Sequence, residues 1–319
     1  FQARQQTSLL FDIWKEEFAP DSDFTHHGQI ELVQFHPSFS YEDFIEGLRP
    51  ILDESGQAQL TLQNGIFKEF CLRAGKWEVD VFKLHLEKEW DQIKIIDLVP
   101  FKEQLSESHW DYIFEIEDQN KLVSNAIPPF FFIIDEINRA ELSRVFGELM
   151  FCLEYRGVKG CVKTQYANLN TNKTGMLPSE QGYQFFIPTN IYLIGTMNTI
   201  DRSVESFDFA LRRRFSWQEV SPDIRLLKFY LSEHCSKWIE LANSLEKLNE
   251  NIKGQALLGN DYQIGHAYVM NLKYPKSLSL TEVKVSIWED SIRPLLQEYL
   301  RGTGEEVELI RSFSKSFGV

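Results

Sequence analysis

Two apolar runs, each followed at once by polar side chains, constrain the fold of this chain most strongly. The first is Phe130–Ile134, which leads into Asp135 and Glu136, and the second starts after Asn190 and ends at Asn198. Uninterrupted apolar runs of this length are typical of strands buried on both faces of a parallel sheet. Because ligands bind at the carboxyl ends of such strands, we expect the polar residues to share one crevice. The pattern favours a site for a nucleotide and magnesium.

Composition and charge set limits on the kind of protein. The chain has 319 residues, of which 43% are hydrophobic and 25% charged, and this is ordinary for a globular protein. Its length allows two domains, or one large domain with insertions. The net charge of -14 argues against a broad basic surface for DNA, since phosphate neutralisation supplies much of the affinity for nucleic acids. A ring pore lined by a few basic residues would still be compatible with this charge.

The cysteines and the hydropathy pattern indicate the compartment. The four cysteines form no Cys-x-x-Cys pair and no zinc-finger spacing, so we interpret them as buried free thiols in a reducing cytosol. No apolar run approaches the roughly 18 residues that a membrane span needs, and no signal peptide is visible. We therefore expect a cytoplasmic protein without a membrane segment.

The order of elements predicts two domains. Strands and helices alternate up to residue 221 and only helices follow, which favours an α/β domain at 1–221 and a helical domain at 222–319. Residues 75–127 show no sharp periodicity and are interpreted as an inserted subdomain or an elaborated connection. Residues 155–187 are rich in Gly, Asn, Thr and Lys, which predicts an inserted β-hairpin.

Local signals predict the individual elements. In the first domain we expect an amphipathic helix at 3–18, a strand at 31–35, and a helix that is capped by Ser40 and ends near Gly47. Further along the chain we expect helices at 66–74, 142–153 and 206–212 and a strand at 216–220. In the second domain we expect Ser221 to cap a helix at 222–234, followed by helices at 236–251 and 279–300, the last kinked or split by Pro294.

The polar residues after the two apolar runs suit phosphate chemistry. An Asp at the position of Asp135 can hold magnesium, usually through water, and the adjacent Glu136 can orient or deprotonate an attacking water. Asn198 could bond the terminal phosphate or that water. The alternatives are a solvated strand end for the acids and a simple turn for Asn198.

A run of three arginines, Arg212–Arg214, follows the helix predicted at 206–212. It is either a solvated surface run or the source of an arginine finger that reaches a neighbouring subunit. Arginine suits the second role because its charge is permanent and its planar group matches phosphate oxygens.

Several of these segments occur in the order found in one known family. The matching blocks are Phe35–Pro50, Asp135–Arg139, Phe146–Leu149, Gly195–Ser203, Ala210–Phe215 and Gln263–Tyr268. On these blocks the chain resembles the McrB family, the AAA+ GTPases of modification-dependent restriction systems. The resemblance covers about residues 31–268, but not 75–127 or the C-terminal tail. It implies an AAA+ P-loop NTPase-type parallel sheet with flanking helices, followed by a helical lid.

The resemblance also implies roles for single residues. Asp135 and Glu136 would form the Walker B pair, with Asp135 on Mg²⁺ and Glu136 in hydrolysis, and Asn198 would be the sensor residue. Asp201 and Arg202 would belong to a signature loop tied to hydrolysis and subunit contacts. Arg213 or Arg214 would act in trans on the nucleotide of the neighbouring subunit. Asn138, Arg139 and, in the lid, His266 would lie near the nucleotide. His266 could equally be a packing histidine, because His readily bonds backbone groups.

Assembly and partners follow from the same resemblance. It implies a hexameric ring with Mg²⁺ and GTP at each subunit interface, ATP being the close alternative. It further implies a nuclease partner of the McrC type and DNA recognition through a separate N-terminal domain. Two other functions stay open at this point: a MoxR-like ATPase that remodels proteins, and a scaffold that hydrolyses nothing.

One departure concerns the phosphate-binding loop. No Gly-x-x-x-x-Gly-Lys-[Ser/Thr] motif occurs in the chain, although this loop normally cradles the phosphates. We expect the first strand and this loop to precede Phe1 in a longer gene product. The other explanation is a shortened protein that cannot hold nucleotide alone.

Overall fold

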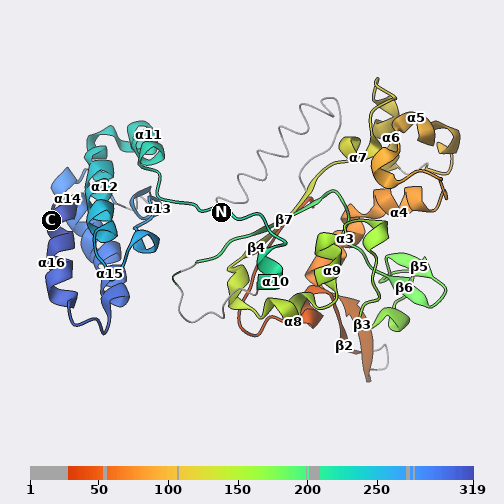
Figure 1. Cartoon of the computed structure of the whole chain (residues 1–319), viewed down its shortest axis with the longest axis horizontal. Coiled ribbons are helices and arrows are strands. Elements are labelled where there is room, and N and C mark those ends of the chain that lie inside the picture. Colours follow the sequence, from red (N-terminus) through yellow and green to blue (C-terminus); the bar gives the residue numbers. More distant parts are fainter. Residues whose placement is uncertain are drawn as a thin grey trace. The chain divides into compact units, whose positions relative to one another are not determined.

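The computed structural model describes residues 28–52, 56–105, 108–198, 200, 209–270, 274–275 and 277–319. The chain divides into two compact units, Phe1–Ser216 and Trp217–Val319 (Figure 1). The helix predicted at 3–18 and the site residues Asp201 and Arg202 lie outside the described residues.

The first unit is built on a parallel sheet. Within the described residues its strand order is β1 (Ile30–Gln34), β4 (Phe130–Asp135) and β7 (Ile191–Gly195), all parallel. Central strand β4 is buried from Phe130 to Ile134. Both predicted apolar strands are therefore confirmed, and they are direct neighbours.

The two faces of the sheet pack against different clusters of apolar residues. Alternate residues of a strand point to opposite faces, and one face of β4 carries Phe132 and Ile134 into the main core of the unit. There the ring of Phe132 meets that of Phe67 edge-on, with centroids 4.9 Å apart. The opposite face carries Phe131 and Ile133, which form a smaller cluster with Ile30 and Ile194.

The segment after β1 follows its prediction only in part. Helix α2 (Tyr41–Phe44) begins after Ser40, whose backbone N–H and hydroxyl both donate to Oδ2 of Asp43, so the predicted cap is confirmed. The helix ends at Phe44 because the chain turns into strand β2 (Glu46–Leu52), which pairs with β3 (Ala58–Asn64). Sequence reasoning missed this hairpin, since most of its large apolar residues are exposed and only Leu62 of β3 is buried. Helix α3 (Ile66–Ala74) has the predicted bounds.

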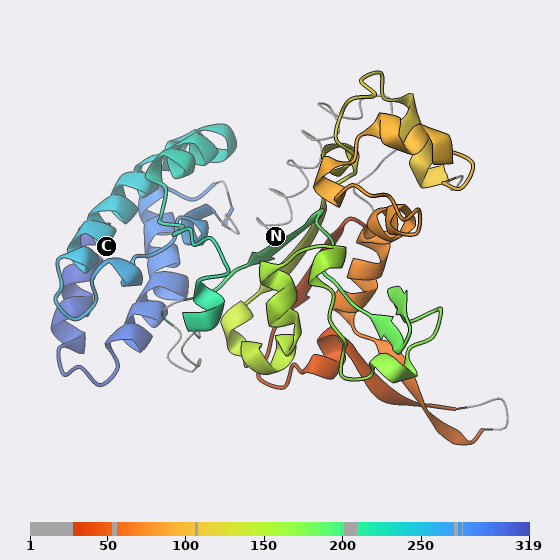
Figure 2. The same cartoon turned by 45° about the vertical axis from the view of Figure 1, so that its right-hand side comes forward.

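Residues 75–127 have a core of their own. Its helices are α4 (Lys76–Phe82), α5 (Ile95–Leu98), α6 (Ser108–Glu115) and α7 (Val123–Ala126). They gather around Trp77 and Trp110, whose ring centroids are 5.2 Å apart. Figure 2 shows this group in orange to yellow.

The segment after β4 corrects one prediction. In place of one helix at 142–153 there are two, α8 (Leu142–Phe146) and α9 (Leu149–Glu154). Gly147 separates them with a φ of 49°, a conformation that glycine tolerates and a continuous helix excludes. The periodic apolar residues fall on both helices, so the pattern alone does not reveal the break.

Strands and helices complete the first unit. Within residues 155–187, β5 (Leu177–Ser179) and β6 (Gly182–Gln184) form an antiparallel hairpin. Helix α10 (Phe209–Arg212) precedes the arginine run. The strand predicted at 216–220 is wrong, because these residues pair with no strand of the described chain.

Within its described residues the second unit contains helices and connecting loops but no strand. Its α-helices are α11 (Ile224–Cys235), α12 (Glu240–Lys253), α13 (Ala267–Met270), α14 (Leu280–Ile287), α15 (Arg293–Leu300) and α16 (Glu306–Phe317). The helix cap is Asp223 rather than the predicted Ser221, since Oδ1 of Asp223 accepts from the N–H groups of Arg225 and Leu226 at 2.8 and 3.0 Å. The predicted split near Pro294 is confirmed: the π-helical segment η8 (Trp288–Ile292) separates α14 from α15, and Pro cannot donate a helical hydrogen bond.

Two broader expectations can be compared with the structure. All four cysteines are free, and Cys71, Cys152 and Cys235 are buried while Cys161 is half-buried. Burial raises the pKa of the Cys152 thiol to about 12, so this group stays protonated at neutral pH. Among the described residues, none of the helices combines the length and the apolar character needed to cross a membrane.

Candidate functional site

The carboxylate of Asp135 lies at the end of β4 and is held from both neighbouring strands. The hydroxyl of Thr196, just after β7, donates to Oδ1 at 2.6 Å. The side-chain amide of Gln34, the last residue of β1, donates to Oδ2 at 3.1 Å. The parallel sheet thus brings three strand ends together and orients one acid between two donors.

Glu136 adopts an uncommon backbone conformation. Its φ of 53° and ψ of 47° lie in the left-handed region, which costs about 1–3 kcal/mol for a residue with a side chain. Its N–H points to Oγ1 of Thr196 at 3.4 Å. Its Oε2 is shielded from solvent and makes no hydrogen bond with the described residues, although Nε of Arg139 lies 3.4 Å away, within ion-pair range. A shielded carboxylate with acceptor capacity suits a group that binds a water molecule.

Asn138 connects the ends of β4 and β7. Its side chain is buried, and Nδ2 donates to the backbone oxygen of Asn198 at 3.2 Å. Asn198 itself is exposed, and its Oδ1 accepts from the N–H of Ile200 at 3.1 Å. The turn that was the alternative for Asn198 is therefore formed, and the same residue contacts Asn138, two residues after Glu136.

The last two arginines of the run have different surroundings. Arg214 forms an ion pair with Glu154 of α9, with Nη2 and Oε2 3.0 Å apart, and its side chain is only 13% exposed. Arg213 is exposed. Of the two predicted candidates for a contact in trans, Arg213 is the one whose side chain is available at the surface.

His266 belongs to the second unit and contacts its backbone. Nδ1 of His266 accepts a hydrogen bond from the N–H of Asp223 at 3.0 Å, directly before α11. This contact matches the packing role that was the alternative for this residue, and it places the neutral ring's proton on Nε2.

The structure thus unites five of the predicted site residues, which are Asp135, Glu136, Asn138, Arg139 and Asn198. Sequence reasoning missed Gln34 and Thr196. A usable signal existed for both, because Gln34 is the last residue of β1 and Thr196 directly follows the apolar run of β7 in the same sheet. Asking which polar residues end neighbouring strands would have found them.

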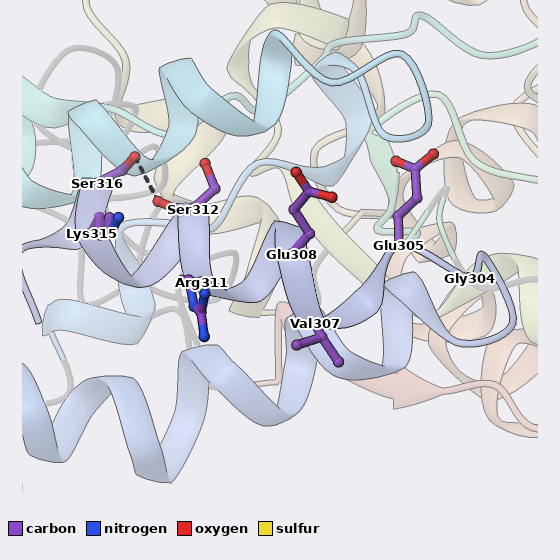
Figure 3. A pocket seen from close by; sticks show the side chains of 8 residues that line it. All are labelled: Gly304, Glu305, Val307, Glu308, Arg311, Ser312, Lys315 and Ser316. Carbon is purple, nitrogen blue, oxygen red and sulfur yellow. Dashed lines mark hydrogen bonds between the residues drawn. The ribbon is translucent and has the colours of Figure 1, made fainter.

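A separate hollow lies on the second unit, along α16 (Figure 3). Acidic Glu305 and Glu308 and basic Arg311 and Lys315 all line it, and no predicted site residue does. Its mixed charges select no ligand class.

Two models of known protein families match the chain, one in each of its two units. A family model described as "AAA domain (dynein-related subfamily)" matches residues 97–215, and one described as "McrB, alpha-helical lid domain" matches residues 240–308. The chain is 31% identical over 283 residues to the type IV methyl-directed restriction enzyme EcoKMcrB subunit of Escherichia coli K12, across 85% of this chain and 47% of that protein. The chain belongs to the McrB family.

The membership agrees with the fold. The AAA-domain match contains β4, β7 and the arginine run, and the McrB lid match contains α12 to α15. The fold is therefore an AAA+ parallel sheet with flanking helices, followed by a helical lid. The chain spans about half the length of the curated McrB relative that it matches.

Proposed function

We propose that this chain is the AAA+ motor subunit of an McrB-like modification-dependent restriction or defence system, and that it hydrolyses GTP, with ATP as the alternative. The observation that carries the proposal is the convergence of Asp135 and Glu136 with Thr196 and Asn198 at the ends of two parallel strands. Two acids fixed by a sheet, beside an amide from the next strand, are suited to positioning a phosphate, a metal ion and a water.

The residues of the site fit Mg²⁺ with a nucleotide. Asp135 would hold the ion, and bound Mg²⁺ neutralises the charge that develops on the phosphates. Phosphate oxygens of the nucleotide and water molecules would supply further ligands. Glu136, with its shielded Oε2, would orient and deprotonate the attacking water, and Asn198 would bond that water or the terminal phosphate.

Subunit contacts complete the proposed site. In a hexameric ring the exposed Arg213 would reach the nucleotide of the neighbouring subunit, while Arg214 would support it from the ion pair with Glu154. Arg139 would hold Glu136 between turnovers. Asp201 and Arg202 would act in hydrolysis and subunit contact.

Partners are proposed by analogy with the curated relative, a methyl-directed restriction enzyme subunit. The motor would drive an McrC-like nuclease in the cytoplasm, and a separate domain would recognise DNA. The net charge of -14 agrees with a motor that does not itself bind DNA through a broad surface.

The test is Mg²⁺-dependent hydrolysis of GTP and of ATP by the purified protein and by Glu136→Gln. We expect GTP turnover that falls at least about 100-fold in Glu136→Gln, as for loss of a general base. Glu103→Gln, at an exposed glutamate of the same unit, is the matched control and should keep full activity. Turnover of ATP alone would replace GTP as the substrate. No turnover of either nucleotide would mean that this chain is a scaffold or lacks a phosphate-binding element that hydrolysis needs. Stimulation of a nuclease on methylated DNA would separate the proposal from a protein-remodelling ATPase.

A further inference from the structure

Thr196 contacts both acids of the candidate site through one hydroxyl. Its Oγ1 donates to Oδ1 of Asp135 at 2.6 Å and lies 3.4 Å from the N–H of Glu136, which points toward it. A hydrogen bond this short to a carboxylate is of the stronger, charge-assisted kind. Thr196 therefore acts on the orientation of Asp135 and on the backbone of Glu136 together.

The backbone of Thr196 is fixed as firmly as its side chain. Its N–H donates to the carbonyl of Ile134 and its carbonyl accepts from the N–H of Ile137, both at 2.9 Å. These bonds continue the pairing of β4 with β7 beyond the strands and across Asp135 and Glu136. Two residues further on, Asn198 accepts the bond from Asn138. Any shift of Asp135 is thus coupled to the segment that carries Asn198.

We propose that Thr196 is a positioning residue that orients Asp135 for Mg²⁺–nucleotide binding and ties the two acids to the strand that carries Asn198. The inference rests on the proposed function. Thr196 satisfies one carboxylate oxygen and Gln34 the other, so the carboxylate cannot rotate without losing a donor. Removal of groups that orient a metal ligand typically lowers metal affinity or activity by 10–100-fold.

The test uses two substitutions at this position. Thr196→Val keeps the shape and the backbone bonds and removes the hydroxyl, whereas Thr196→Ser keeps the hydroxyl. Both are made in the Glu136→Gln background, so that nothing is hydrolysed. Binding of a fluorescent GTP analogue is then titrated with Mg²⁺. We expect Thr196→Val to raise the half-saturating Mg²⁺ concentration about 10-fold or more. Thr196→Ser should restore it to within about threefold of the parent, because the hydroxyl remains.

The control variant is Thr61→Val on β3, a half-buried strand threonine of the same unit, which should leave the Mg²⁺ titration unchanged. Thermal unfolding of each variant verifies that it folds. Equal Mg²⁺ requirements for Thr196→Val and the parent would overturn the inference, and so would equal losses in Thr196→Val and Thr196→Ser, since the hydroxyl would then be irrelevant. If the parent itself shows no Mg²⁺-dependent nucleotide binding, the proposed function fails first, a result distinct from a specific failure of Thr196.

Discussion

Lys68 of α3 forms an ion pair with Glu46 of β2 inside the first unit, and the two side chains are only 1% and 0% exposed. Asn170, from the segment that leads to the β5–β6 hairpin, bonds both: Nζ of Lys68 donates to its Oδ1 at 2.7 Å, and its Nδ2 donates to Oε2 of Glu46 at 2.9 Å. The network joins three parts of the chain that are far apart in sequence.

Loss of Lys68 should be strongly destabilising. Lys68→Met leaves Glu46 buried without its counter-charge, and breaking such a pair costs about 3–5 kcal/mol. Adding Glu46→Gln removes the uncompensated charge and should recover part of the loss. Urea unfolding measures the stability of the first unit in the single and in the double variant. Lys159→Met, which breaks the exposed pair with Glu89, should change stability far less. Similar losses for Lys68→Met and Lys159→Met would contradict the argument.

Glu78 of α4 should make stability fall as the pH rises. Burial raises its pKa above the ordinary value of 4.5, against the hydrogen bonds from the N–H groups of Val158 and Thr189. Its contribution to stability is therefore full below pH 4.5 and is lost as the pH rises through the raised pKa. Glu78→Gln should gain stability relative to the wild type over this rise, measured by urea unfolding from about pH 3 to 7.

Asp80, also on α4, should make stability fall as the pH falls. Burial alone would raise its pKa, but the hydrogen bonds from His109 and Trp110 outweigh burial and hold the pKa below the ordinary 3.8. Its contribution is present above pH 3.8 and is lost as the pH falls through the lowered value. The stability deficit of Asp80→Asn should shrink on acidification. Parallel pH profiles for Asp80→Asn and Glu78→Gln would refute both assignments.

Substitution of Arg214 should lower stability, whereas substitution of Arg213 should lower activity. Arg214→Ala breaks the partly buried pair with Glu154 and should lower the stability of the first unit by about 1 kcal/mol. Arg213→Ala removes an exposed side chain, so stability should stay unchanged while GTP hydrolysis falls about 100-fold or more. Thermal unfolding and turnover assays of the same preparations provide the comparison. Full activity of Arg213→Ala would exclude it as the residue that acts in trans.

Substitution of Gly147 should be destabilising because of the backbone conformation at this position. Gly147→Ala places a Cβ at a φ of 49° and 3.3 Å from the ring of Tyr41, so we expect a loss of about 1–3 kcal/mol. Gly254→Ala, at a helix end with a φ of -70° and no atom nearer than 3.4 Å, should cost little. Each loss is measured from the unfolding transition of its own unit. A tolerated Gly147→Ala would mean that α8 and α9 can reorganise around the break.

Much of the local structure was predictable from short-range signals. The apolar runs before Asp135 and Asn198 predicted β4 and β7, the spacing of apolar residues predicted α3, and the Ser40–Asp43 pair predicted the start of α2. These predictions succeed because burial on both faces, helical periodicity and capping are each written in a few adjacent residues.

Other features depended on contacts between distant residues. The β2–β3 hairpin has large exposed apolar side chains, and the periodic residues between Leu142 and Leu153 continue across Gly147 without showing the break. The strand predicted at 216–220 fails for want of a partner strand among the described residues, since a strand is stable only when it pairs.

The sequence by itself determined which residues form the strands of the site and which acids follow them. Only the tertiary structure decided how those acids are held. Gln34 and Thr196 lie 101 and 61 residues from Asp135, and they meet it because β1, β4 and β7 are parallel and in register. The same is true of the Glu46–Lys68–Asn170 network. Hydrogen bonds and ion pairs depend on position in space to within a few tenths of an ångström, and that position is set by the packing of the whole unit.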